Sequence, residues 1–222
     1  MGALRCKRGD EDFWFLVVYS QGRTEADRLR VSRLWRYVVS LVSALPHRCV
    51  QVLFTDCNGK NGLHRDADGV CLPIEAPVIG GGTAELENSN GTIFRECLEE
   101  QFLCSVHSHL APGHTYFGNI AGARSRIDHV CLQHAMLHTV VSSAVLSSLG
   151  AQLQRIRGPG QRDRIPVSMF FRHHCSFRGS TLKAATVHGI CLHWQMVFCG
   201  VMGVIVLSQL LNGIVLAWPA RL

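Results

Sequence analysis

The feature that most constrains the fold is an apolar run at positions 49–59 that ends abruptly in polar turn residues. Its sequence, CVQVLFTDCNG, is typical of a buried strand that runs into a turn. Alternation along an extended chain places Asp56 and Asn58 on the same side, so the strand delivers a carboxylate and a carboxamide together. The alternative is an ordinary turn, because Asp, Asn and Gly are favoured in turns for purely local reasons.

A strand and a helix precede this run. Residues 13–19 form a short, continuously apolar segment that ends at Tyr19 and indicates a buried strand. Thr24 then opens a helix, with an acidic residue three positions later, and Pro46 ends it. Apolar residues recur between them at helical spacing, at Val31, Leu34, Trp35, Val38, Leu41, Val42 and Leu45. Strand, helix and strand in this order predict an α/β fold with the helix packed on a sheet.

Two later segments complete an ordered set of motifs. Positions 124–132 carry RSRIDHVCL, and positions 162–167 carry RDRIPV. Together with the strand that ends at Tyr19 and the Thr-Asp-Cys-Asn-Gly strand end, they resemble four signatures of the endonuclease/exonuclease/phosphatase superfamily. This superfamily includes abasic-site endonucleases, DNase-I-like enzymes and retrotransposon nucleases. The resemblance covers residues 13–167 and implies a partial DNase-I-like α/β sandwich of retroelement type that lacks the N-terminal strands.

The resemblance also implies roles for individual residues. Tyr19 is expected to approach the scissile phosphate, Asp56 to activate or position the attacking water, and Asn58 to orient the phosphate. Asp128 is expected to orient a catalytic histidine beside the last aspartate, Asp163, which we expect to bind the metal. The implied reaction is hydrolysis of a phosphoester bond.

The implied cofactor is Mg²⁺, a hard cation that binds carboxylate and carbonyl oxygens and keeps several waters. Such an ion stabilises charge on the phosphoryl oxygens. We expect Arg164 and Arg126 to contact the substrate phosphate, since guanidinium groups bind phosphate through paired hydrogen bonds.

The chain departs from the family pattern at three places. Gln21 replaces the proline after the strand tyrosine, and Arg164 stands where the family has its catalytic histidine. An arginine stays protonated at neutral pH and cannot exchange a proton, although it can stabilise negative charge. The first twelve residues hold no strand that resembles the one carrying the family's metal-binding glutamate. Two hypotheses follow, an impaired metal-dependent phosphodiesterase or endonuclease, and a catalytically inactive remnant of that domain.

Three histidines, His107, His109 and His114, suggest a zinc site as another use of this region. A structural zinc site needs four ligands and a catalytic one needs three with a water, and no nearby acid or cysteine pair completes the set. We therefore favour another interpretation of this region, in which residues 113–119 form the edge segment that precedes the Arg-Ile-Asp strand.

Composition allows several substrates. A net charge of +6 over 222 residues permits nucleic acid or another phosphoester without requiring it, so DNA, RNA and phosphoinositides all stay open.

The ten cysteines lack paired spacings and sit largely in apolar runs, which indicates reduced thiols rather than a disulfide framework. The N-terminus shows no apolar signal-peptide core, so we expect an intracellular protein.

The C-terminal region contains an uncharged run at 196–218 that is long enough to cross a bilayer as a helix. We therefore expect an apolar helix there, either membrane-anchoring or buried. The resulting domain prediction is a leader at 1–12, a partial nuclease-like domain at 13–170, a linker at 171–195 and the apolar helix. A membrane-anchored protein carrying a nuclease-like body is thus a third hypothesis.

Overall fold

The computed structural model describes residues 1–8, 11–20, 25–110, 113–117, 123–145, 167–175, 190–199, 204–211 and 214–220. Its centre is a five-stranded sheet in the order β1-β2-β3-β10-β7. These strands are β1 (Gly2–Arg8), β2 (Glu11–Tyr19), β3 (Val50–Asp56), β7 (Leu103–Ser105) and β10 (Asp128–Gln133). β2 and β3 run parallel, while the other neighbouring strands pair antiparallel. The mixed α/β fold that the sequence predicted is confirmed.

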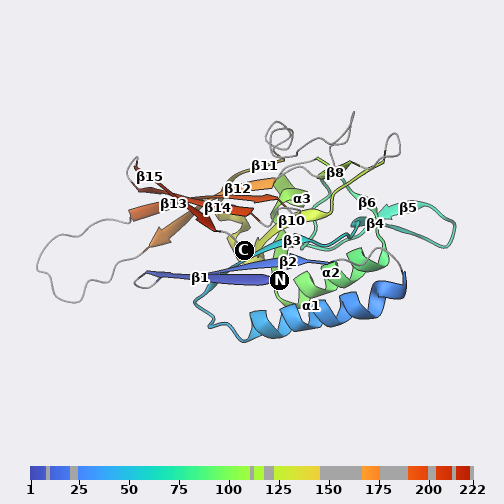
Figure 1. Cartoon of the computed structure of the whole chain (residues 1–222). Coiled ribbons are helices and arrows are strands. Elements are labelled where there is room, and N and C mark those ends of the chain that lie inside the picture. Colours follow the sequence, from blue (N-terminus) through green and yellow to red (C-terminus); the bar gives the residue numbers. More distant parts are fainter. Residues whose placement is uncertain are drawn as a thin grey trace, which may run out of the picture.

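Two helices cover one face of this sheet (Figure 1). They are α1 (Arg28–Ser43), preceded by the 3₁₀ turn η1 (Glu25–Asp27), and α2 (Ser89–Glu100). The apolar stripe of α1 is buried through Val31, Trp35, Val38 and Val42, as its spacing predicted. The Trp35 ring lies 5.2 Å from that of Phe94 in α2, so the two helices share one core with the sheet.

A second sheet packs against the opposite face. Its strands are β11 (Val140–Val145), β12 (Val167–Cys175), β13 (Ile190–Cys199), β14 (Val204–Leu211) and β15 (Ile214–Ala220), in that order. Every neighbouring pair in it is antiparallel. Met169 of β12 joins the core formed by Phe13, Phe15 and Phe54 of the first sheet. The described chain is therefore layered as helices, sheet and sheet (Figure 1).

Shorter elements flank the central sheet. They are β4 (Gly62–Arg65), β5 (Cys71–Pro73), β6 (Glu85–Leu86), α3 (Val106–Leu110), β8 (Tyr116–Phe117), β9 (Arg124–Ser125) and η2 (His134–Thr139). β4, β5 and β6 make a small three-stranded sheet in the segment between β3 and α2. β8 pairs with β9 directly before β10.

The apolar helix expected at 196–218 is wrong. The described residues of that run lie in β13, β14 and β15. The run is rich in Val and Ile, which favour strands, and glycines divide it at intervals that suit short strands better than one helix. Among the described helices, none is long and apolar enough to span a membrane.

The expected leader and linker also contain strands. Gly2–Arg8 form β1, which pairs along the full length of its neighbour, so β2 is not an exposed edge. Parts of β12 and β13 lie within the linker expected at 171–195. The domain boundaries themselves stay a prediction.

Candidate active site

Three of the residues singled out in the sequence are direct neighbours across the central sheet. Tyr19 of β2 is the register partner of Asp56 at the end of β3, and Asp56 is the register partner of Asp128 at the start of β10. Alternation places all three on the face that carries Phe15, Phe54 and the second sheet. We call this row of Tyr19, Asp56 and Asp128 the acidic row.

The acidic row brings two carboxylates together inside the protein. Asp56 is 0% exposed and Asp128 is 1% exposed, whereas the Tyr19 side chain is 41% exposed. Side chains of directly opposed residues in antiparallel strands have Cβ atoms about 5 Å apart, and like charges in such positions repel. The arrangement therefore suits a cation beside the pair, and Tyr19 is the member of the row whose side chain is exposed.

Asn58 lies in the turn beyond β3 rather than on the strand. The strand ends at Asp56, and Asn58 has a φ of 49°, a left-handed conformation that asparagine tolerates better than most residues. Its backbone N–H lies 3.3 Å from Oδ1 of Asp56, and its side-chain amide donates to the carbonyl of Ser20. The amide thus ties the ends of β2 and β3 together beside the acidic row.

The N-terminus of α2 holds this turn in place. The Oδ1 atom of Asn88 caps the helix at 2.8 Å from the Gly91 nitrogen and also accepts from the Lys60 nitrogen at 3.0 Å. The Asn88 amide donates to the carbonyl of Asn58 at 3.3 Å. A Cβ atom on Gly91 would overlap the carbonyl oxygen of Lys60, so only glycine permits this approach.

Hydrogen bonds to Thr115 and to Glu85 of β6 position the Arg-Ile-Asp segment. The Thr115 hydroxyl accepts from the backbone nitrogens of Ile127 and Asp128, each at 3.1 Å. The Glu85 carboxylate accepts from the Ser125 hydroxyl at 2.9 Å and from the Arg126 nitrogen at 2.7 Å. Thr115 lay within a segment that the sequence placed before this strand, but no motif marked Glu85.

Arg126 is almost fully buried in this arrangement, at 3% exposed. Its Nε donates to the carbonyl of Gly113 and its Nη2 to the hydroxyl of Thr83, each at 3.0 Å. Burial lowers the pKa of Arg126 to about 10, so the group remains cationic at neutral pH. In the described arrangement it joins two loops, and the expected phosphate contact stays a prediction.

His129 follows Asp128 but faces the helices. Its ring lies 4.8 Å from that of Phe94, and its Nδ1 is 2.8 Å from the Ser105 hydroxyl. Burial holds the pKa of His129 well below its usual range, so the ring is neutral. It therefore belongs to the core on the opposite face and does not supply the histidine that the family places beside its aspartate.

The other two expected site residues, Asp163 and Arg164, lie outside the described residues, and their roles stay predictions. Within the described part of the chain, no group of three or more His, Cys, Asp or Glu side chains is arranged to hold a metal ion. Two adjacent carboxylates nevertheless fit Mg²⁺, which is commonly held by one or two carboxylates with water and phosphate oxygens completing its shell. The free thiols are Cys6, Cys49, Cys57, Cys71, Cys97, Cys104 and Cys131.

Solved structures that resemble this chain include two from Neisseria. No family model and no curated protein matches the sequence. The 3′-5′ exonuclease (NExo) from Neisseria meningitidis is 14% identical over 74% of this chain, with a TM-score of 0.47. A Neisseria 3′ phosphatase bound to a product DNA hairpin is 14% identical over 76% of this chain, with a TM-score of 0.45. The chain spans 62% and 64% of the length of these two proteins.

Proposed function

We propose that this chain is a Mg²⁺-dependent phosphoester hydrolase of the endonuclease/exonuclease/phosphatase type, acting on nucleic acid or a related phosphoester. The observation that carries the proposal is the acidic row. Three motifs that lie far apart in the sequence meet on one face of the sheet, at positions that are direct register partners. An accidental set of turn residues has no reason to align in this way.

Each member of the site has a role in this proposal. Asp56 positions or activates the attacking water, and Asn58 and Tyr19 orient the phosphate. Asp128 supplies the second carboxylate of the acidic row, and Asp163 contributes to the metal site. When bound, Mg²⁺ supplies positive charge that stabilises the phosphoryl oxygens. Burial of Asp56 and Asp128 strengthens every electrostatic interaction made there, because little water screens it.

The two arginines complete the proposed site electrostatically. Arg164 occupies the position of the family histidine and remains protonated, so it stabilises negative charge without transferring a proton. Arg126 lies two residues before Asp128 and stays cationic. A site with arginine in place of the histidine is expected to hydrolyse its substrate slowly. When catalytic groups act as a unit, the loss of one of them removes most of the rate enhancement that they give together.

The test is hydrolysis of labelled DNA and RNA oligonucleotides, with and without a 3′ phosphate, in Mg²⁺ and in EDTA. We expect slow cleavage that requires Mg²⁺ and that Asp56→Asn abolishes. The matched control is Asp68→Asn, because Asp68 is an exposed aspartate in the loop between β4 and β5. Equal rates for Asp56→Asn and the native chain would overturn the site assignment.

The second candidate is a binding domain that keeps the sheet but not the chemistry. Arg164 favours it, because the proton-transferring histidine is missing. Arg164→His separates the two candidates. If the remaining site is complete, this change raises the hydrolytic rate, whereas a rate that stays at the EDTA background in both proteins supports the binding domain.

A further inference from the structure

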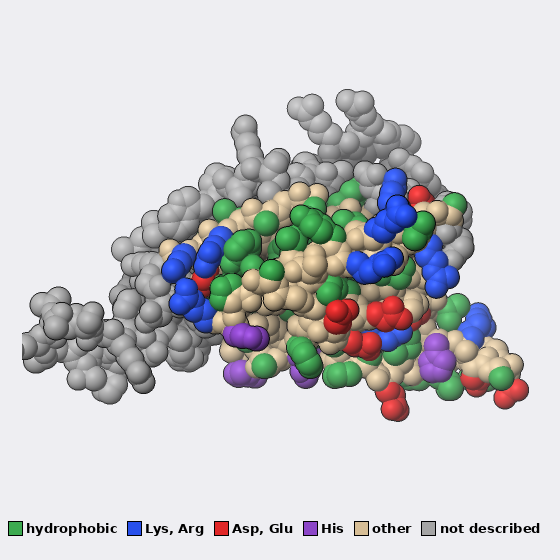
Figure 2. Space-filling model, turned by 90° about the horizontal axis from the view of Figure 1, so that it is seen from below, with side chains coloured by type: hydrophobic (Ala, Val, Ile, Leu, Met, Phe, Trp, Pro, Cys, Tyr) green, Lys and Arg blue, Asp and Glu red, His purple; other side chains and the backbone are tan. Residues whose placement is uncertain are grey.

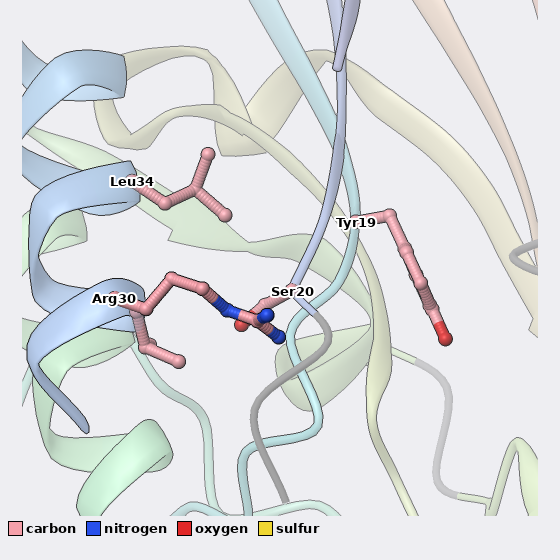
Figure 3. A pocket seen from close by; sticks show the side chains of 5 residues that line it. Tyr19, Ser20, Arg30 and Leu34 are labelled. Carbon is pink, nitrogen blue, oxygen red and sulfur yellow. The ribbon is translucent and has the colours of Figure 1, made fainter. Parts of the chain in front are cut away.

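A pocket lies on the helix-bearing face of the sheet, where the end of β2 meets the start of α1. It has a volume of about 250 Å³ and is lined by Tyr19 and Ser20 at the end of β2 and by Arg30, Val31 and Leu34 at the start of α1. Figure 3 shows the Arg30 side chain directed from the helix toward Ser20, while the Tyr19 ring points away from it. The pocket therefore borders the acidic row at Tyr19, while Arg30, Val31 and Leu34 are contributed by the helix side.

The Ser20 hydroxyl is the unusual group in this pocket. The residue is 0% exposed, and among the described residues its Oγ has no hydrogen-bond partner. Both backbone polar groups of Ser20 are hydrogen-bonded: its nitrogen donates to the carbonyl of Asp56, and its carbonyl accepts from the Asn58 amide. A buried hydroxyl without a partner costs about 1–3 kcal/mol, and such groups generally have an explanation. A polar ligand in the pocket would supply the partner.

The charges around the pocket favour an anion. Arg30 is in the first turn of α1, where helix N–H groups add partial positive charge, and no acidic residue lies in that turn. The nearest described carboxylate is that of Asp27, 3.8 Å from the guanidinium, which is longer than a hydrogen bond, and the Arg30 side chain is 63% exposed. The guanidinium thus has donors available to a ligand. On the helix-bearing face, Lys and Arg side chains gather in separate groups (Figure 2).

We propose that this pocket binds the phosphate group of a sugar phosphate, held by the Arg30 guanidinium and the Ser20 hydroxyl. Guanidinium and hydroxyl donors match the acceptor oxygens of a phosphate. Val31 and Leu34 form the apolar wall, which suits the attached sugar rather than a free anion. The volume is smaller than that of most small-molecule sites, so it admits one sugar phosphate unit and not a larger ligand.

The test is calorimetric titration at low ionic strength with inorganic phosphate, ribose 5-phosphate and a DNA oligonucleotide. EDTA is present throughout, so that metal-dependent hydrolysis consumes none of the probes and the outcome does not depend on the proposed activity. We expect ribose 5-phosphate to bind more tightly than inorganic phosphate. Equal affinities would overturn the placement of a sugar on Val31 and Leu34. Binding of the oligonucleotide alone would overturn the sugar phosphate assignment in favour of a nucleic acid surface.

Three variants localise the binding. Arg30→Gln is expected to weaken binding about tenfold, the scale of a charge-assisted hydrogen bond. Its control is Arg33→Gln, because Arg33 is exposed on the same helix but does not line the pocket. Equal losses in these two variants would show diffuse attraction and overturn the site.

Ser20→Ala is expected to weaken binding about threefold without lowering the melting temperature, since the hydroxyl it removes has no partner to lose. A lowered melting temperature without ligand would show that the hydroxyl bonds within the protein, and would overturn its role in binding.

Discussion

Buried carboxylates at opposite ends of the same sheet are held in different ways. At the start of β2, Asp12 accepts hydrogen bonds from two nitrogens of Arg5, the Nε bond being 2.7 Å long, and Arg48 lies 3.9 Å away. At the other end, the cross-strand neighbour of Asp56 is a second carboxylate, that of Asp128. Both ends belong to the same sheet, yet Asp12 lies beside arginines whereas the register partner of Asp56 is another aspartate.

This difference separates a structural carboxylate from a functional one. The hydrogen bonds from Arg5 hold the pKa of Asp12 well below its usual range, so its charge stabilises the fold. Two ionised carboxylates at the register positions of Asp56 and Asp128 would instead repel each other. Proteins tolerate such local costs mainly at functional sites, where activity and stability compete. The acidic row is therefore where we expect chemistry, and the Asp12 pair is where we expect only stability.

The largest expected effect is on activity at the acidic row. Asp128→Asn should lower phosphoester hydrolysis on the order of a thousandfold, because it removes a buried charge from the developing phosphoryl site. Asp12→Asn, normalised for folded protein, should leave the rate within about twofold of the native value, since Asp12 lies at the other end of the sheet. A comparable loss in both variants would remove the distinction between the two ends.

The next effect is on the turn that carries Asn58. Gly91→Ala should destabilise the protein by about 3 kcal/mol, because the new methyl group meets backbone that cannot move aside. Gly81→Ala is the control, since a Cβ there meets nothing within 4 Å. Denaturant unfolding measures both, and equal stabilities would show that α2 does not hold the site end of the sheet.

A smaller loss is expected at the Asp12 end, with a defined pH dependence. The folded-state pKa of Asp12 is lowered, so its contribution is present above the unfolded value, about 3.9, and is lost as the pH falls through the folded value. Asp12→Asn should therefore be less stable than the native chain at pH 7, with the gap narrowing below about pH 4. A gap that stays constant on acidification would show that Arg5 does not stabilise the ionised form.

The smallest expected effect is at Thr115. Thr115→Val removes the acceptor for two backbone N–H groups and should lower the free energy of unfolding by about 1–2 kcal/mol. The hydrolytic rate should also fall, because one of these N–H groups belongs to Asp128. Thr115→Ser keeps the hydroxyl and should restore both properties. A stable Thr115→Val protein with a native rate would show that this loop does not position the acidic row.

Much of the central layer could be predicted from the sequence. The helical spacing around Trp35 gave α1, and the apolar runs before Tyr19 and Asp56 gave β2 and β3. Local periodicity is sufficient there because each element presents one apolar face to the sheet.

The rest depended on contacts between distant residues. The run 196–218 was expected to be a helix, because a continuous apolar segment has no periodicity that distinguishes a helix from successive buried strands. Glu85 was missed because its partners Ser125 and Arg126 are about forty residues away, and only the folded loops bring them together. The turn at Asn58 was expected as a continuation of the strand, but its left-handed backbone ends the alternation.

The measurement that tests the central claim most directly is thermal unfolding of Asp56→Asn beside the native chain, with and without Mg²⁺. If the acidic row is a functional pair of like charges, the variant unfolds at a higher temperature than the native chain in EDTA, and Mg²⁺ stabilises the native chain more than the variant. If Asp56→Asn instead unfolds at a lower temperature in EDTA, as expected for Asp12→Asn, and Mg²⁺ shifts both chains equally, then Asp56 is a structural carboxylate and the proposed site is wrong.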